Sequence, residues 1–526
     1  MSFATVLAQT CAIALLHMTL SAQEVRDLDR DLALLVPKDT VLLVHVASLG
    51  EATAQVRTLL RAIDEDIAEQ MDLSSLLELF APTIWMDAQG PLTLAFRDPR
   101  FEEPPVAIFR PRDAASFDRE TKELRSAASG SFRALQHPGG IATEPPAMTR
   151  GLPLADLVAR MDAASFSETW RSEVEEPLAQ AAEMLGEQDP SMAGIMEFYV
   201  DLFRNVFDAS LELDLGFEID GTMVDLRGRY RVRADSAFDV GERAAPRLQS
   251  LVGSVRREDP VAFFAAYDYA RLLEAFVPMY RSMEALLPGS PKYADSFEQL
   301  AVLYRGAGPE YAGSFSLGDG GWHLHFSGLS SEPADFVKRY VAWMDSLRSP
   351  AEHWGLETTT APSEVIAGRN ALVHHLRPDW DTLHAFAPEI PRAAFDSLFG
   401  KASWKQVIVA GEDRFVLGFG SDGATGRAQI EHALRGESSV RPDLRKLLDR
   451  CGNGAVFGLS IELRATLRAF LGLAALMAPE DLEIPEVPSG DPIPFLFFWA
   501  AQRAEHRFGY EVDVAAFSEL VRALSK

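Results

Sequence analysis

Cysteine is nearly absent from this chain. Cys11 lies in an apolar N-terminal stretch, and Cys451 is the second of the two cysteines. If that stretch is removed on export, no intramolecular disulfide can form, and the fold depends on its hydrophobic cores. We interpret Cys451 as a reduced, buried thiol. A nucleophilic role would need a neighbouring base, and pairing between two chains is a third interpretation.

Basic residues are scarce relative to acidic ones. The 526 residues include 50 Lys and Arg against 77 Asp and Glu, which gives a formal net charge of −27. A surface of this sign repels phosphate backbones and anionic lipid headgroups. The charge therefore argues against nucleic acid as a partner, and it favours solubility without defining a site.

The sequence also lacks the short motifs of common catalytic sites. It contains no G-x-S-x-G turn, Walker loop, H-E-x-x-H helix or complete EF-hand loop. The segment Gly418-Phe419-Gly420-Ser421-Asp422-Gly423 has the spacing of a dinucleotide-binding fingerprint, but the strand before it looks like half of a hairpin. We interpret these glycines as turn residues, expect no cofactor and assign no catalytic residue.

Two histidines are the weak candidates for a metal site. His323 and His325 lie two residues apart on a predicted strand, so their side chains point to the same face. That spacing can hold zinc if a third ligand completes the site. We favour the alternative, in which the histidines occupy the solvated face of a half-buried sheet. His374-His375 alternates between faces and is a weaker candidate still.

The N-terminus is apolar and uncharged. The first charged residue is Glu24, and the apolar stretch from Val6 to Leu20 ends in Ser21-Ala22. This pattern predicts a signal peptide over residues 1–22 and a protein that is exported to the periplasm or the cell exterior. An uncleaved N-terminal helix or anchor is the alternative, although the stretch is short for a membrane span of about 20 residues.

A strand-to-helix unit recurs along the chain. Each copy is an apolar run that ends in Asp, followed by small residues and a Phe. The copies carry Asp113, Asp162 and Asp513, and we expect each carboxylate to cap the helix that follows. Recurrence at equivalent points favours a structural role over a catalytic one.

Hairpins alternate with these units. Asp220-Gly221 and Asp319-Gly320-Gly321 have the residue types of tight turns between alternating apolar and polar runs. Tight turns and alternating polarity predict an α+β fold, with antiparallel sheets and helices packed on one face. Further hairpins are expected over 91–109, 365–373, 407–417 and 495–512, and helices over 51–63, 238–251 and 334–347.

The length and the order of elements predict two related domains in tandem. A chain of 526 residues exceeds the size of one core, which is about 250 to 300 residues. We expect a signal peptide at 1–22, an N-terminal domain at 23–252 and a C-terminal domain at 253–526, with an inserted hairpin and helix near 400–450. The apolar segments 469–477 and 495–499 are expected to be a buried helix and a central strand, or else a patch for a lipid tail or partner protein.

The strand that opens the mature chain resembles a known type of sequence. Residues 36–46 read Val-Pro-Lys-Asp-Thr-Val-Leu-Leu-Val-His-Val, which resembles the opening of exported bacterial proteins classed as domains of unknown function. The resemblance implies a bacterial envelope protein and carries over no catalytic residue. We therefore expect an exported, non-enzymatic binding or scaffold protein, whose partner is another protein or a hydrophobic small molecule. The alternative is an envelope hydrolase, with or without a metal ion, that uses His323 and His325.

Overall fold

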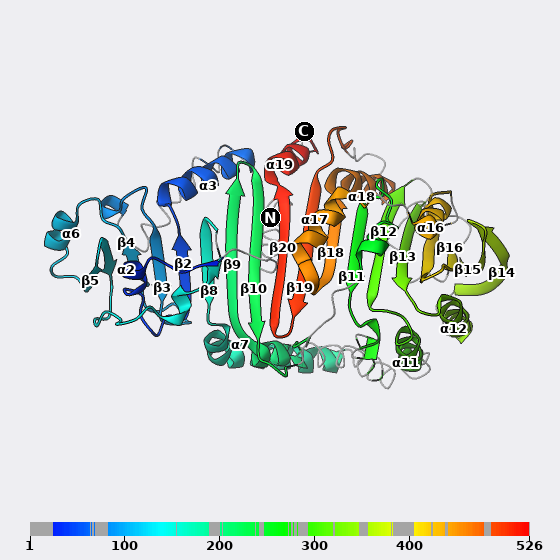
Figure 1. The fold of residues 1–526 in the computed structure, drawn as a ribbon, viewed down its shortest axis with the longest axis horizontal. Coiled ribbons are helices and arrows are strands. Elements are labelled where there is room, and N and C mark those ends of the chain that lie inside the picture. Colours follow the sequence, from blue (N-terminus) through cyan, green and yellow to red (C-terminus); the bar gives the residue numbers. More distant parts are fainter. Residues whose placement is uncertain are drawn as a thin grey trace. The chain divides into compact units, whose positions relative to one another are not determined.

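The structure is a computed structural model, shown in Figure 1. It contains helices and a large antiparallel sheet, so the predicted α+β class is confirmed. Within the part of the chain that it describes, no helix is long and apolar enough to cross a membrane. The described residues are 25–63, 65, 68, 83–153, 155–188, 200–201, 203–236, 238–240, 247–271, 273–274, 277, 281, 293–318, 321–346, 356–379, 381, 404–421, 424–436, 440–477 and 485–524.

The chain divides into two compact units that are not consecutive in sequence. Unit 1 combines Met1–Glu176, Leu202–Arg243 and Phe497–Val521, and unit 2 takes Pro177–Asp201, Ala244–Leu496 and Arg522–Lys526. The expected arrangement of two tandem domains is therefore not confirmed. The duplication and the boundary near residue 252 stay predictions.

Unit 1 contains a series of antiparallel strands that includes three long neighbours, β9, β10 and β20 (Figure 1). The predicted hairpin at Asp220-Gly221 is confirmed, since Asp220 pairs with Met223 and Gly221 has φ +62°. A small side ladder joins β1 (Val25–Arg26) to β7 (Leu152–Pro153). In order of pairing, the series is β5 (Ser126–Ser129), β6 (Phe132–Leu135), β4 (Val106–Phe109), β3 (Leu92–Phe96), β2 (Leu42–Val46), β8 (Leu157–Met161), β9 (Ser210–Asp220), β10 (Met223–Val232), β20 (Glu505–Asp513) and β19 (Pro494–Gln502).

The three aspartates of the recurring unit cap helices, as the sequence predicts. Asp113 accepts hydrogen bonds from the backbone N–H groups of Ala115 and Ser116 at the start of α6 (Ala114–Glu120). Asp162 accepts from Ser165 N–H at 3.1 Å in α7 (Ala163–Gln188), and Asp513 accepts from Ala516 N–H at 3.1 Å in α19 (Val514–Leu524). Each carboxylate satisfies an otherwise unpaired amide of the first turn.

The other helices that the structure describes in unit 1 are α2 (Arg30–Ala33), α3 (Leu49–Ile63) and the 3₁₀ segments Thr83–Trp85 and Ala147–Thr149. The helix expected over 51–63 is thus confirmed. Two clusters of buried side chains hold the unit together. One surrounds Leu32, Leu43 and Ile108, and the other surrounds Phe109 and Phe117. Successive residues of β4 point to opposite faces of the sheet, so Ile108 and Phe109 supply different clusters.

Unit 2 also contains a series of antiparallel strands, together with its own helices. Over the described residues of unit 2, the helices are the part of α7 from Pro177 onward, α9 (Gln249–Val252), α11 (Tyr293–Tyr304), α12 (Pro333–Ser346), α16 (Ala424–Arg435), α17 (Pro442–Cys451) and α18 (Leu463–Met477). The expected hairpins within 365–373 and 407–417 and the helix over 334–346 are confirmed. In order of pairing, the strands are β18 (Ala455–Glu462), β11 (Val261–Ala266), β12 (Glu310–Gly318), β13 (Gly321–Leu329), β17 (Arg414–Ser421), β16 (Trp404–Ala410), β15 (Arg369–Pro378) and β14 (Leu356–Ile366).

Helices cover both faces of the unit 2 strands. Phe336 of α12 stacks on Phe415 of β17 with ring centroids 3.8 Å apart. On the other face, Ile430 of α16 packs with Val416 of the same strand. Because neighbouring residues of a strand point to opposite faces, the expectation of helices on one face is wrong for this unit.

One further sequence expectation is wrong. The helix predicted over 238–251 does not begin at 238, because residues 238–240 form an irregular loop whose Val240 N–H bonds to Arg503 O; its described helical part is Gln249–Val252, and residues 241–246 lie outside the described part. The helix containing 469–477 is α18, whose Phe470 side chain is 59% exposed; the side chains of 473–477 lie outside the described part, so a buried helix and a surface patch both stay predictions. The strand expected at 495–499 is confirmed as part of β19.

Phenylalanine rings lie directly over strand glycines in both units. A Cβ atom on Gly509 would come within 2.2 Å of the Phe498 ring, and a Cβ on Gly458 within 2.3 Å of the Phe264 ring. Both rings are fully buried. A glycine in a strand normally weakens it by leaving a gap, and here a large ring fills that gap.

Candidate functional site

Four charged residues form a row across neighbouring strands of unit 1. Arg160 of β8 lies opposite Asp214 of β9, Asp214 lies opposite Arg229 of β10, and Arg229 lies opposite Arg507 of β20. Directly opposed residues of antiparallel strands project from the same face of the sheet. The row therefore places three guanidinium groups and one carboxylate side by side.

Asp214 is the centre of this row. It is fully buried, and Arg160 donates to both of its oxygens, from Nε to Oδ1 at 2.5 Å and from Nη2 to Oδ2 at 2.9 Å. Arg229 donates to Oδ2 from Nε at 2.9 Å. The second carboxylate of the cluster, Glu212, lies 3.7 Å from Arg160 Nε and 3.6 Å from Arg229 Nη2. Forked arginine contacts of this kind fix a carboxylate in one orientation.

Arg160 is only 2% exposed. Burial lowers the pKa of its guanidinium, but the hydrogen bonds and the charge of Asp214 outweigh that effect and raise the pKa above its ordinary value. The remaining donors bond to backbone, from Nη1 to Arg150 O at 2.5 Å and from Nη2 to Gly151 O at 2.9 Å. The guanidinium is therefore charged and held on several sides before any ligand arrives.

A second charged row runs beside the first. Arg231 of β10 lies opposite Glu212 of β9 on one side and opposite Glu505 of β20 on the other. Arg231 forms an ion pair with Glu212 Oε2. Together the two rows contain four arginines and three carboxylates, so they carry one net positive charge in a chain whose net charge is −27.

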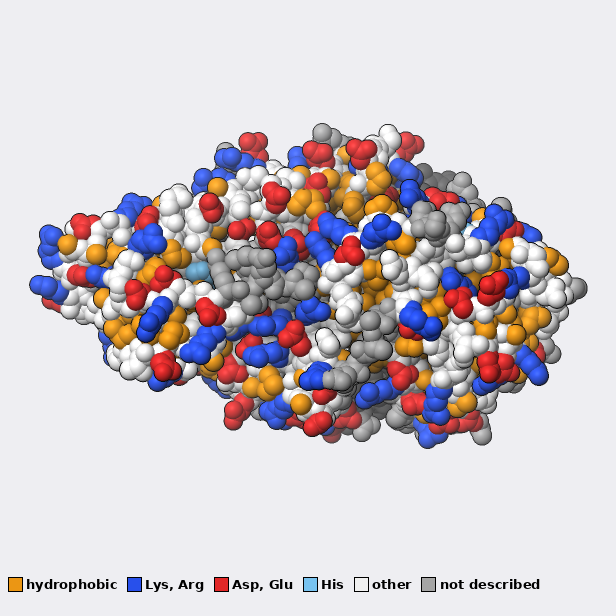
Figure 2. All heavy atoms as spheres, in the orientation of Figure 1, with side chains coloured by type: hydrophobic (Ala, Val, Ile, Leu, Met, Phe, Trp, Pro, Cys, Tyr) orange, Lys and Arg blue, Asp and Glu red, His pale blue; other side chains and the backbone are white. Residues whose placement is uncertain are grey.

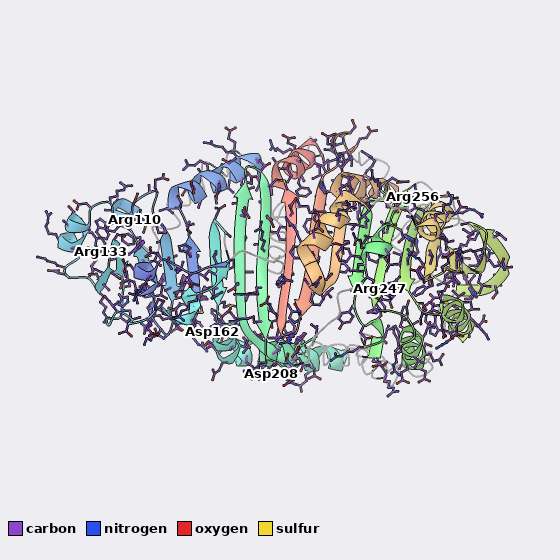
Figure 3. The ribbon with its side chains drawn as sticks, viewed as in Figure 1. Arg110, Arg133, Asp162, Asp208, Arg247 and Arg256 are labelled. Atoms are coloured by element: carbon purple, nitrogen blue, oxygen red, sulfur yellow. The ribbon has the colours of Figure 1, made fainter. Side chains whose placement is uncertain are left out.

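A pocket of about 1050 Å³ opens where these rows reach the ends of β9 and β10. All the residues that line it belong to unit 1. Figure 3 shows Asp162 at the end of β8, where the chain enters α7. The lining residues are Lys38, Thr40, Ala147, Met148, Asp162, Leu211, Glu212, Arg231, Val232, Ala234, Gln502, Arg503, Ala504, Glu505 and Arg507.

The pocket lining has a charged part and an aliphatic part. Four of its side chains are basic and three are acidic, whereas the whole chain has an acidic excess. The basic side chains are Lys38, Arg231, Arg503 and Arg507. Acidic and basic side chains are mixed over the face of the molecule shown in Figure 2. A site with a local basic excess on such a protein attracts anions that the rest of the surface repels.

The sequence candidates His323 and His325 lie in unit 2 and are both buried, with exposures of 5% and 0%. The interpretation that they occupy a solvated face is wrong, because α16 packs against β13 and β17 on that face. A Cβ on Gly426 of α16 would come within 2.8 Å of His323 Nδ1, which shows how closely the helix lies over this histidine.

The second histidine takes part in a buried hydrogen-bond chain. Ser314 Oγ donates to Asp259 Oδ2 at 2.5 Å, and His325 Nδ1 lies 3.1 Å from the same Ser314 oxygen. Burial lowers the pKa of His325 to about 3 and raises the pKa of Asp259 above its ordinary value. His325 is therefore neutral at pH 7 and donates from Nδ1 to the serine.

This chain of three residues has the wrong order for nucleophilic catalysis. A catalytic serine gives its proton to a histidine base, whereas the single proton of Ser314 already points to Asp259. Among the described residues, no group of three or more His, Cys, Asp or Glu side chains is placed to hold a metal ion. The cluster joins β12 and β13 to Asp259, which lies two residues before the start of β11.

Gly418 and Gly420 lie inside β17, so the interpretation of these two glycines as turn residues is wrong, and their role is in packing. β17 pairs with β16 as a hairpin, as the sequence indicates. A Cβ on Gly418 would meet Ile430 of α16 at 2.6 Å, and one on Gly420 would meet Trp322 O at 2.1 Å. Residues 422 and 423 lie outside the described part of the chain.

Cys451 and His374 are buried as well. The thiol of Cys451 is inaccessible and lies 3.9 Å from Phe457 O, which agrees with the prediction of a buried cysteine. His374 is fully buried, with Nδ1 3.5 Å from Thr360 Oγ1. Neither residue lies in the pocket of unit 1.

The charged rows were not predicted from the sequence, although a local signal exists. Arg160 interrupts the apolar strand Leu157-Val158-Ala159-Arg160-Met161, and arginine occupies alternate positions 227, 229 and 231 of the next hairpin. A charge in an apolar strand indicates a buried partner. The sequence alone does not show that Asp214 is that partner, because it lies 54 positions away from Arg160.

Comparison with known proteins does not identify the chain. No family model matches it, and no curated protein matches it significantly. Two crystal forms of a protein named TP0453 match part of it. Form III is 9% identical, with a TM-score of 0.24, and covers 52% of this chain and 98% of that one; form IV is 10% identical, with a TM-score of 0.25, and covers 52% and 96%. These scores are too low to assign a shared fold.

Proposed function

We propose that the protein is an exported, non-enzymatic binding protein of the bacterial cell envelope, and that the pocket of unit 1 is its ligand-binding site. The observation that carries this proposal is the coincidence of a pocket of about 1050 Å³ with the two charged rows of β8, β9, β10 and β20. Export rests on the apolar, uncharged residues 1–22.

The charged rows support binding because they are organised without a ligand. Of the row residues, Glu212, Arg231, Glu505 and Arg507 line the pocket, and Glu212 is held by its ion pair with Arg231 and by Arg160 Nε and Arg229 Nη2 at 3.7 and 3.6 Å. A site whose side chains are already ordered loses less conformational entropy when it binds a ligand. Because less of the contact free energy is used to order side chains, more of it appears as binding affinity.

The chemistry of the lining also fits binding. Residues with guanidinium, ammonium and carboxylate groups line the pocket together with the half-buried Met148 and the exposed Leu211, while Val232 is buried at its edge. These groups recognise ions and apolar surface. One lining carboxylate, Asp162, is already engaged as the cap of α7, since it accepts from Ser165 Oγ at 2.7 Å as well as from the backbone.

The test is native mass spectrometry of the mature protein purified from the envelope fraction of its own host. We expect a discrete extra mass that disappears under denaturing conditions. The variant Ala234→Trp places an indole at the pocket lining without changing charge and should remove that mass. The control Arg119→Glu, an exposed site on α6 outside the pocket, should keep it. An extra mass retained in Ala234→Trp, or bare protein in every preparation, would contradict the proposal.

A further inference from the structure

We infer that the ligand of the unit 1 pocket is an amphipathic anion: an aliphatic body that carries one carboxylate or phosphate head. This inference rests on the proposed function and names the chemistry of the same site. It combines two properties of the pocket, its local basic excess and its aliphatic wall.

The cross-strand register explains why a negative head is expected. Arg229 and Arg507 lie directly opposite each other on β10 and β20. Like charges in directly opposed positions destabilise an antiparallel ladder. Asp214 contacts Arg229 from the β9 side, where it is shared with Arg160. Arg507 lines the pocket, so an anionic head bound there would lie next to the positive charge that the two opposed arginines bring to this face.

The count of charges in the lining points the same way. Lys38, Arg231, Arg503 and Arg507 face Glu212, Glu505 and Asp162. Asp162 is held by the first turn of α7, and Glu212 by its ion pair with Arg231. Arginine in this setting suits a carboxylate or phosphate because its planar fork matches both oxyanions.

The aliphatic wall indicates that the ligand is more than an inorganic ion. Met148, Leu211 and Val232 line the pocket with three alanines. Leu211 is 39% exposed, so a ligand in the pocket can cover more of its side chain. The volume of about 1050 Å³ also exceeds what a single phosphate needs and lies at the upper end for small-molecule sites, about 300 to 1,000 Å³. An alkyl chain would cover the wall while its head meets the arginines.

The experiment is isothermal titration of the mature protein with five probes below their micelle concentrations. Dodecanoate and dodecyl phosphate carry the two candidate heads on one alkyl chain. Dodecanol removes the charge, dodecyltrimethylammonium reverses it, and inorganic phosphate removes the chain. The protein variants are Arg507→Glu, Ala234→Trp and the matched charge control Arg119→Glu.

We expect one or both dodecyl anions to bind. The affinities for dodecanol, dodecyltrimethylammonium and inorganic phosphate should be lower by about tenfold or more, which is the ratio that one charge-assisted contact gives. Arg507→Glu should lower the affinity for the dodecyl anions by a similar factor, and Ala234→Trp should abolish their binding. Arg119→Glu should leave the affinity unchanged. The relative affinity of the two anions decides between a carboxylate and a phosphate head.

Three results would overturn the inference: equal affinity for dodecanol, equal affinity for inorganic phosphate, or anion binding that Arg507→Glu leaves unchanged. The proposed function fails separately. If the envelope-purified protein carries an extra mass that Ala234→Trp removes, yet no dodecyl anion binds, only the inference is wrong. If neither the extra mass nor any probe is detected, the binding function itself is wrong.

Discussion

Arg160 and Asp214 occupy directly opposed positions on β8 and β9, and both are buried, with exposures of 2% and 0%. Two hydrogen bonds join them, at 2.5 and 2.9 Å. Removing two charges from water is costly, and the cost is offset only when each charge keeps good partners. The pair therefore ties the stability of unit 1 to the same strands that form the pocket.

Asp214→Asn should destabilise unit 1 strongly. The substitution leaves Arg160 buried without its counter-charge, and breaking such a pair typically costs about 3 to 5 kcal/mol. We expect a large decrease in the urea concentration at the unfolding midpoint, measured by tryptophan fluorescence. The control Asp208→Asn breaks the exposed ion pair with Arg171 and should lower the free energy of unfolding by at most about 1 kcal/mol. Equal midpoints for the two variants would show that the Arg160 pair is not buried in solution.

The stability should decrease as pH decreases from about 6.5 towards 3, because of His325. Burial lowers its pKa in the folded state from 6.5 to about 3. Between these values the unfolded chain binds a proton that the folded chain does not, so acid favours unfolding by up to about 1.4 kcal/mol for each pH unit. The measurement is the unfolding midpoint at pH 7, 6 and 5.

His325→Gln supplies the control for this pH dependence. Gln keeps a hydrogen-bond donor near Ser314 but does not titrate, so the slope of stability against pH should become smaller even if the variant is less stable throughout. Burial also lowers the pKa of His137 and His506, and these contribute a residual slope of the same sign. An unchanged slope in the variant would mean that His325 is protonated in the folded state.

Asp113→Ala should lower the free energy of unfolding by about 1 kcal/mol. The carboxylate satisfies two backbone N–H groups of α6, and loss of such a cap costs about 0.5 to 2 kcal/mol. Asp113→Asn should restore most of the loss because Asn also caps helices well. Glu123→Ala, at an exposed position beyond the same helix, should stay within about 0.5 kcal/mol of the parent protein. Urea unfolding of the four proteins distinguishes a cap from a general effect of charge.

Gly509→Ala should destabilise the protein by about 1 to 3 kcal/mol through overpacking, since the new methyl group would come within 2.2 Å of the buried Phe498 ring. Adding Phe498→Leu should recover part of this loss, so that the two effects are not additive in a double-mutant cycle. Gly472→Ala has no atom within 4 Å of its new Cβ and lies in α18, where alanine favours the helix. Gly472→Ala should leave the free energy of unfolding unchanged or raise it. A loss of stability in this control would mean that the effect of Gly509→Ala is not due to overpacking.

Local sequence signals predicted local structure well. The hairpin at Asp220-Gly221 and the caps at Asp113, Asp162 and Asp513 depend on residues within a few positions of one another. Turn geometry and capping are decided by such neighbours. These features are therefore readable from one sequence.

Contacts between distant segments account for the errors. His323 and His325 alternate with apolar residues in a way that fits a solvated face, but α16, about 100 positions later, covers that face. The pocket escaped prediction for the same reason, because its lining comes from residues near 38, 147, 162, 211, 231 and 503. The isolated Arg160 in an apolar strand is a local signal of a buried charge, but its partner Asp214 lies 54 positions away and cannot be identified from the sequence alone.

The pairing of β10 with β20 has a consequence for the newly made chain. Thr222 Oγ1 donates to Asp513 Oδ1 at 3.0 Å, and the two residues lie 291 positions apart. Until β20 has been synthesised, one edge of the ten-residue strand β10 exposes backbone donors and acceptors. Such an edge pairs readily with strands of other chains. By pairing with β10, β20 protects this edge from pairing with other chains, and a chain cut short before Glu505 would lack that protection.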